Sequence, residues 1–385
     1  QNDLVNQSSP VQIPGTTWSR QCVSAGAPAD RPHIYAVKTN GTLWTWGSAN
    51  KGGLGLNESG PGPSEGNVKK SSPTQIPGTS WSTERGKIGP GPYDNCYAIK
   101  TNGQLWAWGS NYYGSLGQNQ SPSPGGDIVG YSSPVQIPGT YTWCAGSKKN
   151  VGCFVKSNGE AWMVGSLAGW THTEAVIGGH QNRSSPVQLP GTNWRSMHPD
   201  QDGYGILMTK TDGTLWYMGD WNSGLNGQTL PENRFEDVYG TGAVSSPIQI
   251  PGTTWTTKVS VFEKAAAAVK TDGTLWTWGK NSRGKLGHSD LYDGKILSPR
   301  QVGSDNNWDI AEMAHWYTVA TKTDGTIWTW GGNYFGALGN GTAGYNGTTG
   351  EFQNSSPVQL PGSGFGWTVG MQACGSSCRA LKSVN

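Results

Sequence analysis

The chain has 385 residues, of which only 14% are charged, and its formal charge is +2 (27 basic minus 25 acidic residues). It lacks a long basic run, which argues against a nucleic-acid binder, and it lacks the run of about 18 apolar residues that a transmembrane helix requires. The 59 glycines and 23 prolines suggest turns, whereas 20 tryptophans need a buried environment. Because disordered chains are poor in aromatic residues, the composition indicates a compact β protein.

One segment, Ser-Ser-Pro-Val-Gln-Ile-Pro-Gly, opens at Ser8 and returns along the whole chain. A tryptophan follows each copy, and then comes a short apolar run that ends in a lysine. The copies begin near residues 8, 71, 132, 184, 245, 297 and 355, the tryptophans are residues 18, 81, 143, 194, 255, 308 and 367, and the lysines are residues 38, 100, 156, 210, 270, 322 and 382. This periodicity predicts a repeat architecture in which residues 1–385 form a single domain.

An Asn-Gly or Asp-Gly pair follows six of the seven lysines, and a run such as Thr42-Leu-Trp-Thr-Trp-Gly47 follows each pair. Both residues of a two-residue hairpin turn need positive φ, which Asn, Asp and Gly tolerate. Each repeat therefore predicts four short strands: a (Ser-Pro-Val-Gln), b (after the tryptophan), c (ending in the lysine) and d (Leu-Trp-x-Trp-Gly). Four strands per repeat without helical periodicity are typical of propeller blades.

Two of these segments, Lys270–Gly287 and Gln372–Lys382, resemble the RCC1 (regulator of chromosome condensation) repeat family, and the resemblance extends over essentially the whole chain. It implies an all-β, seven-bladed RCC1-like propeller, of the bacterial, phage or secreted kind. The family's functions include nucleotide exchange with chromatin docking, inhibition of secreted hydrolases, and adhesion or scaffolding. The fold alone does not choose among these functions.

The seventh repeat ends at Asn385 without the Asn/Asp-Gly turn and the d strand, and Gln1–Gln7 do not supply them. We therefore expect an incomplete last blade. An exposed sheet edge is a site for strand addition, so this blade could also serve self-assembly.

The connections between strands predict two unlike faces. Successive strands cross the blade in opposite directions, so the uniform a–b and c–d turns share one face, and the variable b–c and d–a loops share the other. Variable loops on a rigid scaffold commonly bind partners. The predicted contacts on this loop face are Arg31, His33, Tyr93, Tyr112, Tyr113, Trp170, His172, Trp221, Tyr334 and Phe335.

No pattern in the chain indicates catalysis. The six histidines lack zinc-ligand spacing, there is no Gly-x-Ser-x-Gly elbow, and the carboxylates are scattered. We expect no enzyme activity, no cofactor and no metal site.

The six cysteines allow disulfides. Cys374 with Cys378 and Cys144 with Cys153 flank b–c connections, where cross-hairpin bonds are feasible. Cys22 and Cys96 lie in neighbouring repeats and could join them. The alternative is buried free thiols.

The sequence favours a non-enzymatic binding or structural module on a cell surface, extracellular filament or virion. Its partner would be a protein or a surface glycan, with no nucleic acid and no membrane span. The alternatives are a secreted enzyme inhibitor and, less favoured, an RCC1-type nucleotide exchange factor or chromatin binder.

Overall fold

A computed structural model describes most of the chain. The described residues are 13, 17–25, 33–49, 51–58, 68–91, 94–120, 130–147, 151–166, 182–200, 205–220, 224–228, 243–289, 294–333, 337–340, 353–361, 367–368 and 381–382. The chain divides into two compact units. Unit 1 comprises Gln1–Asp3 and Ile13–Gly203, and unit 2 comprises Leu4–Gln12 and Tyr204–Asn385.

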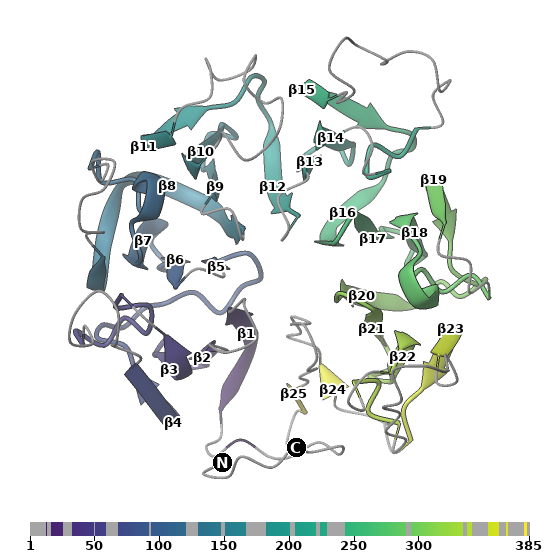
Figure 1. Ribbon diagram of the computed structural model, residues 1–385, viewed down its shortest axis with the longest axis horizontal. Helices are drawn as coiled ribbons and strands as arrows, with labels where there is room; N and C mark the ends of the chain where they lie inside the picture. Colours follow the sequence, from purple (N-terminus) through teal and green to yellow (C-terminus); the bar gives the residue numbers. More distant parts are fainter. Residues whose placement is uncertain are drawn as a thin grey trace. The chain divides into compact units, whose positions relative to one another are not determined.

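Unit 1 consists of short antiparallel strands (Figure 1). One sheet has the order β1-β2-β3-β4, and a second has the order β11-β10-β9-β8-β7-β6-β5. The strands are β1 (Trp18–Ala25), β2 (His33–Lys38), β3 (Leu43–Ala49), β4 (Val68–Gln75), β5 (Ile88–Gly91), β6 (Asn95–Ile99), β7 (Gln104–Gly109), β8 (Tyr131–Ser147), β9 (Val151–Lys156), β10 (Ala161–Ser166), β11 (Asn182–Gln188) and β12 (Trp194–Pro199), with the 3-10 turn η1 (Tyr112–Gly114).

Unit 2 repeats the same antiparallel plan, with β13 paired to β14 and β14 to β15, followed by sheets β16-β17-β18-β19 and β20-β21-β22-β23 and the pair β24-β25. The strands are β13 (Gly205–Lys210), β14 (Leu215–Asp220), β15 (Ala243–Ile250), β16 (Trp255–Phe262), β17 (Ala265–Lys270), β18 (Leu275–Lys280), β19 (Lys295–Gln301), β20 (Trp308–Met313), β21 (Tyr317–Lys322), β22 (Ile327–Gly332), β23 (Gln353–Gln359), β24 (Trp367–Thr368) and β25 (Leu381–Lys382), with the 3-10 turn η4 (Ser282–Gly284). In the described part of the seventh repeat, β24 and β25 form a two-stranded sheet.

The sheets are displaced by one strand from the sequence repeat. Strand a of the second repeat, β4, pairs with strand d of the first repeat, β3, and Thr74 lies opposite Thr45. The same holds for β18 with β19 and for β22 with β23. The grouping of strand a with b, c and d of its own repeat is therefore wrong. In these sheets the outer strand comes from the next repeat, so backbone hydrogen bonds join consecutive repeats.

The predicted hairpins between strands c and d are confirmed, but their turn is not the predicted two-residue type with positive φ at both Asn/Asp and Gly. Only the glycine has positive φ, and the turn is centred on the two residues that precede it. In the first repeat, Gly41 has φ +75° and its N–H donates to the Lys38 carbonyl oxygen at 2.9 Å. The Asn40 Oδ1 accepts bonds from the Thr42 N–H (3.1 Å) and hydroxyl (2.7 Å), and the Thr42 Oγ1 accepts the indole N–H of Trp44 at 2.8 Å. This relay fixes the turn and the first tryptophan of strand d together.

The a–b and c–d turns lie on the same face, as the alternating direction of the strands predicts. The N–H of Trp81, just after an a–b turn, donates to the Gly41 oxygen in a c–d turn at 3.0 Å. Thr101 in the next c–d turn donates its N–H to the Ser80 oxygen at 2.8 Å. These turns form what we call the turn face of each unit.

The tryptophans that follow the a–b turns and the second tryptophans of the d strands supply the largest buried side chains, as predicted, whereas the first tryptophans of the d strands (44, 106, 162, 216, 276 and 328) are only partly buried. Trp81, Trp108, Trp255, Trp278 and Trp330 are at most 1% exposed. In unit 2, Trp255 and Trp278 pack with Leu207 and Leu215 of the preceding repeat in one hydrophobic cluster. Burial of a large side chain contributes on the order of 2–3 kcal/mol, so each repeat stabilises its neighbour.

The cross-hairpin disulfide between Cys144 and Cys153 is wrong, because both thiols are free and buried. Cys144 lies opposite Phe154, and Cys153 lies opposite Ala145. The two cysteines are thus one position out of register, and alternate residues of a strand point to opposite faces of the sheet. Cys96 is also a free buried thiol, which removes its predicted bond to Cys22. Burial raises the pKa of all three thiols. Cys374 and Cys378 lie outside the described residues.

Candidate binding face

The d–a loops of several repeats begin with one backbone motif. A non-glycine residue with positive φ is followed by a glycine with positive φ, as in Lys51-Gly52, Tyr113-Gly114 and Arg283-Gly284. Two positions after this glycine comes a buried leucine, which anchors the motif in the core: Leu54, Leu116 and Leu286. The loop is therefore part of the rigid scaffold at its start.

An inter-repeat hydrogen bond holds the loops at Lys51 and Arg283 and a third d–a loop, at Leu225. The second tryptophan of the next d strand donates its indole N–H to a carbonyl oxygen in the loop. These bonds are Trp108 to Gly53 (3.1 Å), Trp278 to Leu225 (3.0 Å) and Trp330 to Lys285 (2.8 Å). The Tyr35 hydroxyl donates to the same Gly53 oxygen. We call this arrangement the indole latch.

The first residue of the motif has a different side chain in each loop, although its backbone conformation is the same. Lys51, Tyr113 and Arg283 have φ of 49°, 59° and 61°. A bulky residue in this region is strained by on the order of 1–3 kcal/mol, and such strain concentrates at functional sites. Glycine would be free of the strain. Positive φ by itself does not mark this face, because Ser80, Asn193 and Thr254 adopt it in the a–b turns. What distinguishes the loop position is that it carries large side chains of three different chemistries.

In unit 1 this position belongs to an aromatic patch. Tyr112 and Tyr113 are 37% and 36% exposed, and their rings meet edge to face with centroids 4.4 Å apart. The Lys51 ammonium lies 5.4 Å from the Tyr112 ring. Exposed tyrosines beside a cation are typical of interface hot spots.

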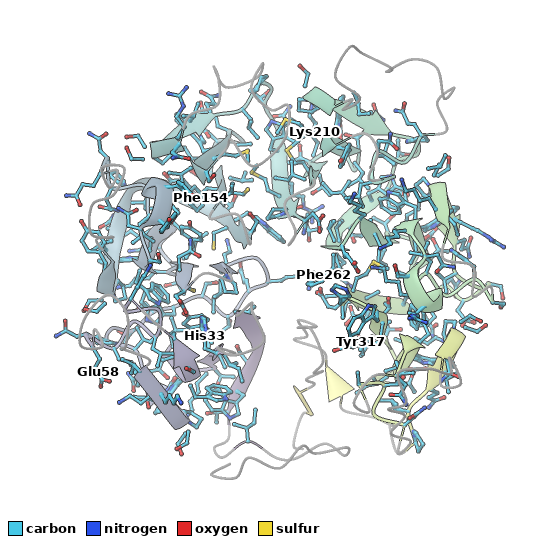
Figure 2. All side chains as sticks on the ribbon, viewed as in Figure 1. His33, Glu58, Phe154, Lys210, Phe262 and Tyr317 are labelled. Carbon is cyan, nitrogen blue, oxygen red and sulfur yellow. The ribbon has the colours of Figure 1, made fainter. Side chains whose placement is uncertain are left out.

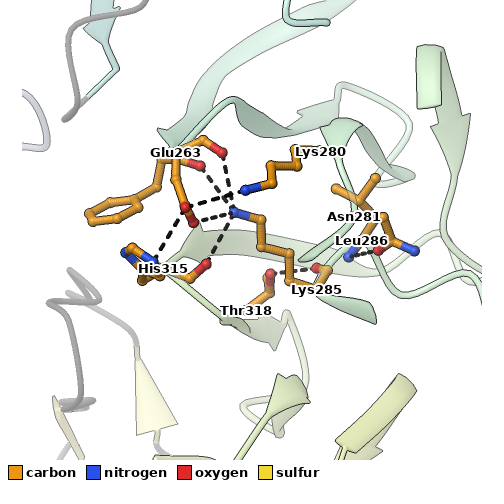
Figure 3. A network of polar contacts seen from close by, with 8 residues as sticks. Glu263, Lys280, Asn281, Lys285, Leu286, His315 and Thr318 are labelled. Carbon is orange, nitrogen blue, oxygen red and sulfur yellow. Dashed lines mark hydrogen bonds and ion pairs between the residues drawn. The ribbon is translucent and has the colours of Figure 1, made fainter. Parts of the chain in front are cut away.

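In unit 2 the corresponding loop carries a polar network (Figure 3). Lys285 is fully buried, and its ammonium donates to the carbonyl oxygens of Phe262 (3.4 Å), Glu263 (3.4 Å) and His315 (3.2 Å). Its ammonium also lies 3.6 Å from the Glu263 carboxylate, which pairs with Lys280 at 3.5 Å and with His315 at 3.3 Å. The network connects two repeats through one buried cation.

A second buried polar group lies in unit 1 at the end of β12. The Ser196 hydroxyl and the His198 Nε2 are 2.8 Å apart, and Trp143 packs against the His198 ring. Burial, and to a smaller extent the nearby Arg85, hold the pKa of His198 well below its usual range. The imidazole is therefore neutral near pH 7. Ser196 is 0% exposed, so this pair supports packing rather than reaction.

Three of the predicted contact residues can be placed. Tyr112 and Tyr113 are exposed on the loop face, whereas His33 is 0% exposed and packs edge to face on Tyr35. His33 is therefore a core residue of β2. Arg31, Tyr93, Trp170, His172, Trp221, Tyr334 and Phe335 lie outside the described residues.

The sequence reasoning missed Lys51, Arg283 and the Lys285 network. Figure 2 draws the side chains of the described residues on the strands, with Phe262, whose carbonyl oxygen accepts a bond from Lys285, among the labelled residues. A comparison of the repeats could have found Lys285, because the same place in Gly-x-Leu-Gly holds Gly53, Ser115 or Ala337 elsewhere. Among the described residues, no cluster of three or more His, Cys, Asp or Glu could hold a metal ion. No helix in the described ranges is long and apolar enough to cross a bilayer.

Comparisons with known proteins support the repeat assignment. The family model for the "Regulator of chromosome condensation (RCC1) repeat" matches residues 272–320 and 324–380. The human E3 ubiquitin-protein ligase HERC2 is 23% identical over 317 residues, which cover 80% of this chain but only 6% of that protein. The ultraviolet-B receptor UVR8 of Arabidopsis thaliana is 25% identical over 352 residues, covering 88% of this chain and 69% of the receptor.

A solved structure supports the fold class. Prp20p of Saccharomyces cerevisiae, described together with its binding to Gsp1p and histones, superposes with a TM-score of 0.67. The sequences are 15% identical, and the match covers 97% of this chain and 93% of Prp20p. The predicted propeller fold is thereby confirmed. These relatives are eukaryotic, and the bacterial, phage or secreted origin stays a prediction.

Proposed function

Because the chain carries RCC1 repeats and has the fold of an RCC1-like β-propeller, we propose that it is a non-enzymatic module that binds a protein partner through its loop face. One observation carries this proposal: Lys51, Tyr113 and Arg283 share one strained backbone conformation but present three different side chains. The backbone of this position is constant while its side chain changes from repeat to repeat, which supports a role in binding.

The chemistry of the loop face suits a protein partner. The exposed Tyr112–Tyr113 pair with Lys51 offers aromatic and cationic contacts in unit 1. In unit 2, Lys280 and His315 are each about one-third exposed beside the buried Lys285. Aromatic residues and arginine dominate the binding energy of protein interfaces, which matches Tyr112, Tyr113 and Arg283.

We place this binding on a cell surface, an extracellular filament or a virion. The low content of charged residues and the abundance of Gly, Asn, Ser, Thr and Trp support this location. The free thiols Cys96, Cys144 and Cys153 give it no support. An enzyme inhibitor that used the same loops is the second candidate.

Glycine substitutions test the proposal directly. Tyr113→Gly and Arg283→Gly should keep or raise stability, by up to about 1 kcal/mol, because glycine accepts positive φ. The same variants should lose the partner that a photo-crosslinker at Tyr112 captures from the native source. A crosslinker at Val358, which is 40% exposed on the outer strand β23, is the control.

The outcomes separate structure from function. Loss of stability with unchanged capture would show that these side chains serve the fold, and the proposal would be abandoned. Equal capture from Tyr112 and Val358 would also contradict it. Capture of nucleosomes or of an enzyme would identify one of the alternative functions.

A further inference from the structure

Each of the three c–d turns of unit 1 contains an exposed Asn-Gly pair. The pairs are Asn40-Gly41, Asn102-Gly103 and Asn158-Gly159. Asparagine before glycine is prone to spontaneous deamidation, because glycine has no side chain to shield its backbone nitrogen from the asparagine amide carbon. In a folded chain the reaction requires the turn to open, so its rate depends on how firmly each turn is held.

The backbone of the three turns is held in the same way. The glycine N–H donates to the carbonyl oxygen of the lysine three residues earlier, at 2.9 Å for Gly41, 2.8 Å for Gly103 and 3.0 Å for Gly159. The oxygen of each glycine accepts a backbone N–H of the next repeat at 2.8–3.0 Å. These bonds withhold the glycine nitrogen from reaction to a similar extent at all three sites.

The asparagine side chains, in contrast, are held unequally. Each Oδ1 accepts the N–H of the residue two positions on at 3.1 Å. The Thr42 hydroxyl adds a second bond to Asn40 at 2.7 Å, and Asn158 hydrogen-bonds the Glu160 carboxylate and thereby lowers the pKa of Glu160. Asn102 has Gln104 at this place, and in the described part of the chain its side chain makes one hydrogen bond, with the Gln104 N–H.

We propose that Asn102 is a site of spontaneous deamidation, and that the Thr42 hydroxyl protects Asn40 from the same reaction. The Gly103 nitrogen loses its proton to hydroxide, and its electron pair forms a bond to the Asn102 Cγ. The Cγ–Nδ2 bond then breaks, and the leaving nitrogen takes a proton from water and departs as ammonia. Water opens the resulting cyclic succinimide at either carbonyl, which gives aspartate or isoaspartate at position 102.

The two products should affect the turn differently. Aspartate is the residue that the c–d turns of unit 2 have at this place, as at Asp272, so this product keeps the turn. Isoaspartate makes the main chain one carbon longer. The bond from the Gly103 N–H to Lys100 and the bond from the Tyr141 N–H to the Gly103 oxygen then lose their register. The isoaspartate form therefore loosens the junction between the second and third repeats.

Peptide mapping by mass spectrometry tests the proposal on the full chain aged at mildly alkaline pH. Deamidation at Asn102 should be about fivefold faster than at Asn40 or Asn158, the effect of one hydrogen bond on the opening of the turn. In urea the three sites should react at similar rates, because each asparagine lies between a Thr or Ser and a glycine. Asn226-Gly227 is the internal control: Asn226 is 2% exposed, so it should react in urea and stay intact in the folded chain.

Gln104→Thr and Thr42→Gln are the matched variants. Gln104→Thr supplies the missing hydroxyl and should slow the reaction at Asn102 to the rate of Asn40 in the unmodified chain. Thr42→Gln should raise the rate at Asn40 to that of Asn102. Circular dichroism checks that both variants fold. Equal rates at the three sites of the folded chain would overturn the proposal, as would a folded Gln104→Thr variant that still reacts at Asn102 at the original rate.

Hydrogen exchange at the Tyr141 N–H tests the structural consequence. Exchange should quicken in the isoaspartate fraction of the aged chain, because the bond to the Gly103 oxygen is lost. Asn102→Asp is the control and should exchange as slowly as the unmodified chain. Slow exchange in the isoaspartate fraction would show that the junction between the repeats is not loosened and would contradict this part of the proposal.

Discussion

The c–d hairpins of the two units form the same turn but use different residues before the glycine. Unit 1 uses Asn40, Asn102 and Asn158, whereas unit 2 uses Asp212, Asp272 and Asp324. In unit 2 every Asp accepts the N–H and hydroxyl of a threonine two residues on, and that threonine accepts the following indole N–H. In unit 1 only the first repeat keeps this relay.

The difference has a structural cost in the second repeat. Gln104 stands where the relay has threonine, and the Trp106 indole N–H is left buried without a partner. In the third repeat Glu160 replaces the threonine and accepts the Trp162 indole N–H at 3.2 Å. The turn itself therefore depends on the Asn or Asp and the glycine, while the threonine serves the tryptophan beneath it.

The indole latch is the feature that both units share, and its loss should have the largest effect. Trp108→Ala in unit 1 and Trp278→Ala in unit 2 should each lower the free energy of unfolding by about 3–5 kcal/mol, because a buried aromatic side chain leaves a cavity. Urea denaturation followed by circular dichroism measures both. A much smaller loss for Trp108→Ala would show that the Tyr35 hydroxyl suffices to hold the Gly53 carbonyl.

Acid should affect unit 1 first, through His198. Its pKa is lowered in the folded chain, so the unfolded chain takes up the proton first, and stability falls as the pH drops below the unfolded value of about 6.5. His198→Gln should remove this loss between about pH 7 and pH 5. The loss is measured as the difference between the denaturant midpoints at about pH 7 and pH 5. If this difference is the same in the variant as in the unmodified chain, another group causes the effect.

The threonine relay can be exchanged between the units. Gln104→Thr should raise the free energy of unfolding by about 1 kcal/mol, because it gives the buried Trp106 indole an acceptor. Thr274→Gln is the matched control in unit 2 and should lose about as much, since the Trp276 indole then lacks its partner. Equal and small effects of both variants would show that the relay carries little stability.

The aspartates of the c–d turns should have the smallest effect on stability, and this effect should appear at lower pH than that of His198. Hydrogen bonds from the Thr214 and Thr274 side chains lower the pKa of Asp212 and Asp272. For Asp324, desolvation raises the pKa, but the bonds from Thr326 outweigh it and the net pKa is lowered. A lowered pKa stabilises the fold above the unfolded value of about 3.9, and this stability is lost as the pH falls further.

Replacement of all three aspartates by asparagine should make unit 2 resemble unit 1. The denaturant midpoint of this variant should fall less steeply than that of the unmodified chain as the pH falls below about 4. If the midpoint of this variant depends on pH as that of the unmodified chain does, other carboxylates cause the dependence. In unit 1, Asn40→Asp should acquire the acid dependence, because Thr42 supplies the same side-chain hydrogen bond there.

The sequence by itself determined the repeat, the hairpins and the periodic tryptophan core, because these follow from local rules. The glycine of each Asn-Gly or Asp-Gly pair supplies the positive φ that the c–d turn needs, and apolar residues that recur in the repeats supply the core. The free thiols belong to what the structure decided, because the register that puts Cys144 and Cys153 on opposite sheet faces overturned the disulfide expected from the sequence.

The tertiary structure decided what depends on neighbours distant in sequence. Strand a joins the preceding sheet because its hydrogen-bonding edge matches strand d there, and nothing in its own residues indicates which repeat it will join. Lys285 is buried because carbonyl groups of two separate turns surround it, and His33 is buried because Tyr35 and its sheet cover it. Exposure is a property of the packed repeats, so sequence pattern could propose binding residues but could not separate Tyr113 from His33.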